Sequence, residues 1–180
     1  GEVLAARDWD FVRLQLNYFD WDYQNSREKY ELCAAAGLQV IVMEPVRGGM
    51  LNTLCPEAAE ILRAAAPERS LASWAIRWAA SLPGVLCVLS GMSTREQVED
   101  NVASMDPFVP LTTAEQATLA KALEVFRARQ LVPCTACRYC MPCPAGVDIP
   151  AMMHVWNEYR LHGDRAANLK ENYNDAPEAA

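Results

Sequence analysis

The feature that most constrains the fold of this chain is the alternation of short apolar segments with helix-like segments over its first two-thirds. The apolar segments lie at Asp10–Leu16, Leu38–Met43 and Gly84–Ser90. Strands that alternate with helices predict βαβ units and a parallel sheet. The second segment, LQVIVM, is nearly continuously apolar, which is typical of a parallel strand covered on both faces. The predicted class is therefore α/β.

Capping residues predict where the helices begin and end. Ser26–Gly37 starts with a serine and ends with a glycine, and Ser93–Met105 has Glu96 three residues after Ser93, which is capping-box spacing. Further helices are expected at Pro56–Ala65, Ser70–Ser81, Thr112–Arg129 and Asp148–Gly163. Three strands form only part of such a parallel sheet, so the outer two are expected to present open edges. The pattern indicates a piece of a larger fold.

Charge and composition exclude several classes of partner. The chain has 180 residues, is 52% hydrophobic and carries a formal net charge of −7. Nucleic acid and anionic membranes both reward a basic face, so neither is an expected partner. No signal peptide is expected, and the longest weakly charged stretch, 71–92, is interrupted by Arg77, Pro83 and Gly84, so it is not a membrane span. A cytoplasmic protein is expected.

Four of the seven cysteines lie close together, in the sequence CTACRYCMPCP. Cys134, Cys137 and Cys140 are separated by two residues each, and Cys143 stands directly before a proline. This spacing is close to that of the bacterial iron–sulfur run. Three thiolates spaced in this way can wrap around three corners of a cubane cluster, and the fourth corner needs a thiolate from elsewhere. The run therefore predicts a 4Fe-4S cluster.

Structural zinc and a redox disulfide are the alternatives for the cysteine run. Zinc ribbons place two Cys-x2-Cys pairs a dozen or more residues apart, whereas these four cysteines follow one another directly. In two-cluster ferredoxins the cysteine before proline binds the other cluster, so Cys143 is expected to serve a second cluster if that rule holds here. The scattered cysteines, Cys33, Cys55 and Cys87, are interpreted as core residues.

Several segments, in their order along the chain, resemble the C-terminal half of aldo/keto reductases, and more closely the branch with a C-terminal ferredoxin-like 4Fe-4S domain. They are FVRLQLNYFD, GLQVIVMEPVRGGML, SWAIRWAASLPGVLCVLSGMSTREQVEDN and the cysteine run. The resemblance implies the last three strands of a (β/α)8 TIM barrel and then a small α-helical ferredoxin-like segment. The expected organisation is a partial barrel at 1–105, a linker and amphipathic helix at 106–130, an iron–sulfur-binding segment at 131–163 and a polar tail at 164–180.

The resemblance implies part of a nicotinamide nucleotide site and no catalytic residue, because the catalytic Asp, Tyr, Lys and His of the family lie on its first four strands. Gln15 matches the residue that hydrogen-bonds the nicotinamide carboxamide, and Met43 stands where many members have a tyrosine that stacks on the ring. A loop that leads into a helix N-terminus suits the adenosine phosphate. The remaining matched positions are Glu44, Arg47, Ser90, Gly91, Met92, Ser93, Gln97, Asp100 and Asn101.

The resemblance leaves the choice between NADP and NAD open. Many members place Lys and Arg, which recognise the 2′-phosphate of NADP, where this chain has Gly91 and Gln97, and Arg95 offers a substitute charge. The first functional hypothesis is the C-terminal part of an NAD(P)-dependent oxidoreductase that acts on a small carbonyl or alcohol, with an electron-transfer protein as a further partner. The alternative is a non-enzymatic iron–sulfur electron-transfer or interaction module with a barrel remnant.

Overall fold

The computed structural model describes residues 4, 6–23, 25–129, 132, 134 and 138–162. The elements are β1 (Phe11–Gln15), α2 (Asp20–Tyr23), α3 (Ser26–Ala35), β2 (Gln39–Met43), the 3-10 helix η1 (Met50–Asn52), α4 (Pro56–Ala65), α5 (Leu71–Ala80), β3 (Val85–Val88), α6 (Arg95–Met105), α7 (Thr113–Ala128) and α8 (Ile149–His162). All expected strands and helices are present. The short helices α2 and η1 were not expected, because about one turn is too short to show a periodic pattern.

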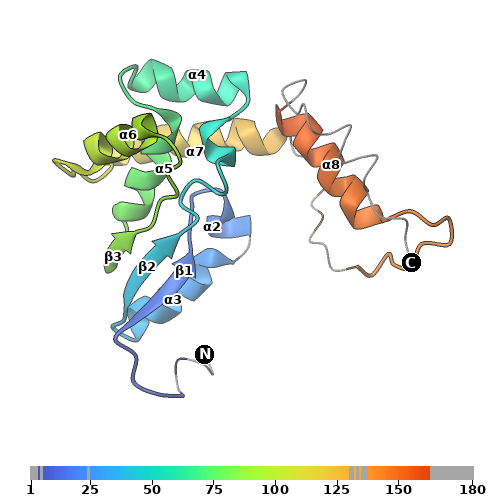
Figure 1. Cartoon of the computed structure of the whole chain (residues 1–180), viewed down its shortest axis with the longest axis horizontal. Coiled ribbons are helices and arrows are strands. Elements are labelled where there is room, and N and C mark those ends of the chain that lie inside the picture. The colour runs from blue at the N-terminus through green and yellow to red at the C-terminus, as the bar shows by residue number, and fades with distance from the viewer. Residues whose placement is uncertain are drawn as a thin grey trace.

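The three strands form one parallel sheet in the order β1-β2-β3, which confirms the predicted α/β class. Along β1 and β2, Phe11 pairs with Gln39 and Gln15 pairs with Met43. Because the strands are parallel, their carboxyl ends lie at one edge of the sheet. In Figure 1 the sheet lies below helices α4, α6 and α7.

Helices cover one face of the sheet in the described part of the chain. Val40 and Val42 of β2 are buried and pack in a cluster with Tyr30 of α3 and Ala79 of α5. The alternate side chains of β1 are exposed, beginning with Phe11, which is 49% exposed. Side chains alternate between the two faces of a strand, and only one set meets the helices. The expectation that these strands are covered on both faces is therefore wrong within the described residues.

A second core lies where α4, α5 and α7 pack together. Its buried side chains include Phe19, Trp74, Leu119 and Phe126. The rings of Phe19 and Phe126 meet edge to face, with their centroids 5.7 Å apart. Leu123 is partly buried against the same cluster, which confirms the apolar face predicted for α7. This core supports the loops that leave β1 and β2.

Two helix starts differ from the expectation by one residue. Asn25, with a φ of 53°, occupies the N-cap of α3, and Ser26 is buried as the first helical residue. The capping box of α6 is formed by Thr94 and Gln97 rather than by the pair one residue earlier. Both pairs have the same spacing in the sequence, so the spacing could not choose between them.

The scattered cysteines fall into two groups. Cys33 and Cys55 are buried, as predicted for core residues, whereas Cys87 is exposed. The prediction for Cys87 is wrong because it lies on β3, an outer strand of the sheet.

Among the described helices, none combines the length and apolar character needed to cross a bilayer.

Candidate functional site

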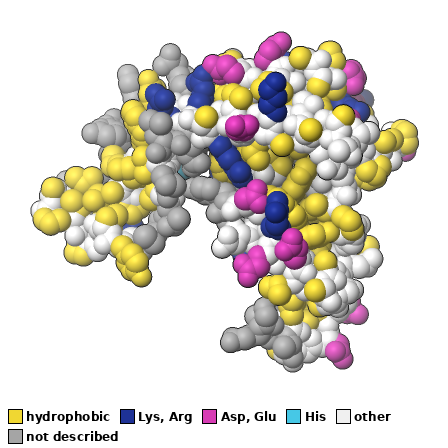
Figure 2. Space-filling model, turned by 180° about the vertical axis from the view of Figure 1, so that it is seen from behind, with side chains coloured by type: hydrophobic (Ala, Val, Ile, Leu, Met, Phe, Trp, Pro, Cys, Tyr) yellow, Lys and Arg dark blue, Asp and Glu magenta, His cyan; other side chains and the backbone are white. Residues whose placement is uncertain are grey.

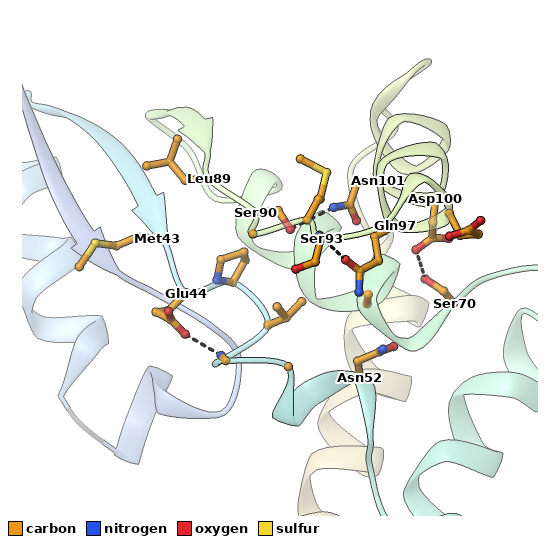
Figure 3. A pocket seen from close by; sticks show the side chains of 18 residues that line it. Met43, Glu44, Asn52, Ser70, Leu89, Ser90, Ser93, Gln97, Asp100 and Asn101 are labelled. Carbon is orange, nitrogen blue, oxygen red and sulfur yellow. Dashed lines mark hydrogen bonds between the residues drawn. The ribbon is translucent and has the colours of Figure 1, made fainter.

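A cavity of about 770 Å³ lies at the edge of the sheet where the strands end. The residues that follow β2 form one wall, and the loop after β3 and the first turns of α6 form the other (Figure 3). Ligands of open α/β sheets bind outside the carboxyl ends of the strands, where loops and helix N-termini meet. The cavity also falls in the size range of small-molecule sites. It is therefore the main candidate for a binding site.

The cavity brings together all predicted nucleotide residues except Gln15 and Arg47. Those that line it are Met43, Glu44, Ser90, Gly91, Met92, Ser93, Gln97, Asp100 and Asn101. They come from the ends of two neighbouring strands and from α6, so the parallel sheet places them around one space. That these residues bind a nucleotide stays a prediction.

Hydrogen bonds hold the α6 wall of the cavity in place. Asn101 Nδ2 donates to Ser90 Oγ over 3.0 Å and ties α6 to the loop after β3. Ser70 Oγ donates to Asp100 Oδ2 over 2.6 Å and ties α6 to the start of α5. Ser70 was predicted only to begin a helix, and its hydroxyl also accepts from the Ser73 N–H as the cap of α5. The wall is therefore pre-formed.

The N-terminus of α6 is capped by the protein itself. Gln97 Oε1 accepts from the backbone N–H groups of Ser93, over 2.6 Å, and Thr94, over 3.3 Å. The Thr94 hydroxyl in turn accepts from the Gln97 N–H over 3.3 Å. Free N–H groups at a helix N-terminus are the usual donors to a bound phosphate. An anion that binds here must share these donors with the Gln97 side chain.

A buried carboxylate follows β1. Asp20 is fully buried, and each of its oxygens accepts from Arg47 Nε over 3.1 Å. Its Oδ2 also accepts from Asn17 Nδ2 over 3.0 Å and from Gln15 Nε2 over 3.3 Å. The two predicted nucleotide residues that do not line the cavity are therefore bound to one carboxylate. Sequence reasoning missed Asn17 and Asp20, although polar residues directly after a strand were the available signal.

The same network supports the loop after β2. Glu44 and Arg47 have φ values of 57° and 50°, in the left-handed region that residues with side chains rarely adopt. Asn17 Nδ2 donates to the Glu44 carbonyl oxygen over 3.1 Å, and the Gly48 N–H donates to Glu44 Oε2 over 2.6 Å. Such strained backbone persists only where the surroundings over-determine it. Asn17, Asp20 and Arg47 provide that constraint.

The cavity lining combines neutral polar side chains with apolar surface and three carboxylates, those of Glu44, Glu96 and Asp100. Hydroxyls of Ser90 and Ser93 and amides of Asn52 and Asn101 offer neutral hydrogen-bond partners for ribose, phosphate and amide groups. Met43 adds a polarizable apolar surface at the end of β2.

The cysteine segment is described only in part. Cys134, Cys140 and Cys143 are described, whereas Cys137 and the tail at 164–180 lie outside the described residues. Within the described ranges no three His, Cys, Asp or Glu side chains gather closely enough to hold a metal ion. The iron–sulfur cluster therefore rests on the cysteine spacing, and it stays a prediction.

Helix α8 is linked to the start of this segment and carries exposed aromatic side chains. Asn157 Nδ2 donates to the Val132 carbonyl oxygen over 2.6 Å, and its Oδ1 accepts from the Val132 N–H over 3.2 Å. Trp156 and Tyr159 are exposed on α8, and Tyr139 beside Cys140 is 96% exposed. Figure 2 shows hydrophobic side chains gathered on this lobe of the molecule, at the left.

Comparison with known proteins places the sheet and its cavity in a family. The sequence model of the aldo/keto reductase family matches residues 2–124. The chain belongs to the aldo/keto reductase family. The matched residues include all three strands, both walls of the cavity and most of α7, and they end before the cysteine run. The family assignment thus covers the sheet and the cavity, and it does not extend to the cysteine run.

Solved aldo/keto reductases share the fold. AKR11C1 from Bacillus halodurans, in its apo and holo forms, matches with a TM-score of 0.53 and 24% sequence identity. The match covers 67% of this chain, 46% of the apo structure and 45% of the holo structure. The chain thus spans less than half the length of these relatives, with an α/β arrangement consistent with part of a TIM barrel. No curated protein matches the chain.

Proposed function

We propose that this chain is the nucleotide-binding, C-terminal part of an aldo/keto reductase-like oxidoreductase that carries a 4Fe-4S cluster. The observation that carries the nucleotide part is the cavity lined jointly by the loop after β2, the loop after β3 and the first turns of α6. Family membership supports a nicotinamide nucleotide and a small carbonyl or alcohol as ligands. In this proposal the catalytic acid and its partners lie outside these residues, so the chain alone does not turn over substrate.

The residues of the proposed site divide between the two ends of the nucleotide. Gln15, held by Asp20, hydrogen-bonds the nicotinamide carboxamide, and Met43 covers a face of the ring. When bound, the nucleotide supplies or accepts the hydride. The chain's own residues only bind and orient it. Glu44 and Arg47 shape the loop beside the nicotinamide end, and the phosphates and adenosine lie against Ser90, Gly91, Met92, Ser93, Gln97, Asp100 and Asn101.

Filling the cavity at Gly91 is expected to weaken nucleotide binding at least about tenfold. A Cβ added at Gly91 meets no heavy atom within 4 Å, so Gly91→Trp is tolerated by the backbone and places its ring in the open space of the cavity. Isothermal titration calorimetry of the chain with NAD and NADP measures the loss.

Val98→Trp is the matched control for this substitution. Val98 lies on α6, is 42% exposed and does not line the cavity, so the same ring there should leave affinity unchanged. Equal losses with both variants would contradict the site. A folded wild-type chain that binds neither nucleotide would favour the iron–sulfur module without enzymatic function.

We propose further that Cys134, Cys137 and Cys140 hold three corners of one cluster and that Cys143 serves a second cluster. Thiolates two residues apart match the iron–sulfur run, and the cysteine before proline serves the other cluster in two-cluster ferredoxins. The cluster, when bound, supplies a one-electron carrier. Hydride transfer moves two electrons, so a one-electron cluster does not couple to it directly. The cluster then either passes electrons to a partner protein or stabilises the fold.

Cysteine substitution with anaerobic reconstitution tests this assignment. We expect Cys137→Ser to abolish iron and acid-labile sulfide binding, whereas Cys143→Ser keeps the first cluster. Cys87→Ser, at an exposed thiol on β3, is the control and should retain wild-type iron content. Loss of the cluster on Cys143→Ser to the same degree as on Cys137→Ser would instead show that the four thiolates close one site locally.

A further inference from the structure

We propose that the cavity accepts NAD in preference to NADP, an inference that rests on the proposed nucleotide site. The two nucleotides differ in one group, the 2′-phosphate on the adenosine ribose of NADP. At neutral pH a phosphate monoester adds about −1.5 to −2 charges and three strong acceptor oxygens. A site that prefers NADP must supply cations or free donors to this group.

The cavity lining carries only negative formal charge. Among the described residues that line it none is lysine, arginine or histidine, and three are acidic: Glu44, Glu96 and Asp100. Like charges brought into a shared cleft repel, and a cleft lined by one sign of charge focuses a negative potential. The repulsion acts on the additional phosphate whichever way round the nucleotide lies. NADP is therefore disfavoured relative to NAD by the cavity as a whole.

The nearby arginines do not provide the missing cation. Arg47 binds both oxygens of the buried Asp20, and its guanidinium lies 4.7 Å from the centroid of the Phe19 ring. Arg95, at the start of α6, pairs with Glu99 over 2.7 Å on the exposed side of the helix and does not line the cavity.

The neutral donors at the start of α6 are already engaged. The N–H groups of Ser93 and Thr94 both bind Gln97 Oε1. A 2′-phosphate at this helix end would have to displace the Gln97 side chain from these two N–H groups. The helix N-terminus therefore gives NADP little compensation for the missing cation.

Two carboxylates of the cavity suit an unmodified ribose. Glu96 and Asp100 are four residues apart on α6, so they lie on the same helix face, and both line the cavity. A carboxylate accepts hydrogen bonds from ribose hydroxyls, as the acidic residue of NAD-binding folds does. A hydrogen bond from its own backbone N–H, followed by one from the Thr94 side chain, lowers the pKa of Glu96 and keeps it ionised. The same carboxylates thus repel the 2′-phosphate of NADP and accept hydrogen bonds from the free ribose hydroxyls of NAD.

Calorimetric titration of the chain with NAD and with NADP tests the preference directly. We expect NAD to bind at least about tenfold more tightly at low salt, and the difference to shrink as ionic strength rises. Equal or tighter binding of NADP would overturn the preference while leaving the proposed function intact. Binding of neither nucleotide by the folded chain would overturn both.

Charge substitutions inside the cavity separate charge from shape. Gly91→Lys should raise NADP affinity relative to NAD about tenfold, because the position has room for a side chain and the ammonium neutralises the 2′-phosphate. Gly91→Gln is the neutral control of similar length and should leave the ratio unchanged. Asp100→Asn keeps an acceptor for the Ser70 hydroxyl and should reduce the preference for NAD over NADP. An equal change with Lys and Gln, or loss of NADP binding in Arg95→Gln, would contradict the electrostatic origin.

Discussion

Replacing Arg47 with methionine is expected to lower the free energy of unfolding by about 3–5 kcal/mol. The guanidinium is the cationic partner of Asp20, whose side chain is fully buried. Without it the carboxylate keeps only hydrogen bonds from Asn17 and Gln15, and an uncompensated charge stays buried. The loop after β2 also loses the contact that holds Arg47 at its positive φ. Urea denaturation followed by tryptophan fluorescence measures the change.

Two comparisons make this result specific to the buried charge. Arg27→Met breaks a pair with Asp22 whose side chains are 52% and 55% exposed, so the expected loss is below about 1 kcal/mol. Adding Asp20→Asn to Arg47→Met removes the unpaired buried carboxylate and should restore part of the lost free energy of unfolding. If Arg27→Met and Arg47→Met cost the same, or if the double variant is the least stable, then the buried pair does not stabilise the fold.

Phe126→Ala should also cost about 3–5 kcal/mol of unfolding free energy. Phe126 is fully buried in the core formed by α4, α5 and α7, where its ring meets Phe19. Truncation removes the ring from this contact and leaves a cavity beneath the loop after β1. The same denaturation experiment measures it, with Glu124→Ala on the exposed side of α7 as a control near zero.

The losses of unfolding free energy caused by Arg47→Met and by Phe126→Ala should not be additive. Phe19 contacts Phe126 and lies under the guanidinium of Arg47, so both substitutions loosen the same residue. Residues that share a partner typically show coupling of about 0.5–3 kcal/mol. The double variant Arg47→Met/Phe126→Ala is therefore expected to lose less than the sum of the single losses. A strictly additive loss would indicate that the loop after β2 is independent of the α7 core.

Local signals in the sequence were sufficient for the elements. The helix predicted at Pro56–Ala65 has those same bounds in the structure, and β2 begins one residue after the predicted start. Caps, prolines and apolar runs act within a few residues, so a sequence records them directly. The same local rules failed at the start of α6, where two overlapping pairs had equal spacing and only the folded loop showed Thr94 as the cap.

The resemblance to aldo/keto reductases also predicted residues in both walls of the cavity. Residues matched one by one to the family, such as Ser90 and Asn101, do line a common space. The resemblance could not show where the side chains of Gln15 and Arg47 point. Their direction depends on Asp20, a residue that the resemblance did not single out. The cysteine run remains a matter of sequence, since Cys137 lies outside the described residues.

The sequence by itself determined a parallel α/β sheet and the aldo/keto reductase family, because both are written in short-range patterns and matched motifs. Only the tertiary structure decided three properties of the described residues: one face of the sheet is uncovered, Gln15 and Arg47 share the buried Asp20, and the cavity lining is acidic without a cation. These properties arise where side chains from the ends of different strands meet. Burial and charge at such a place depend on every segment that packs there, which no single stretch of sequence contains.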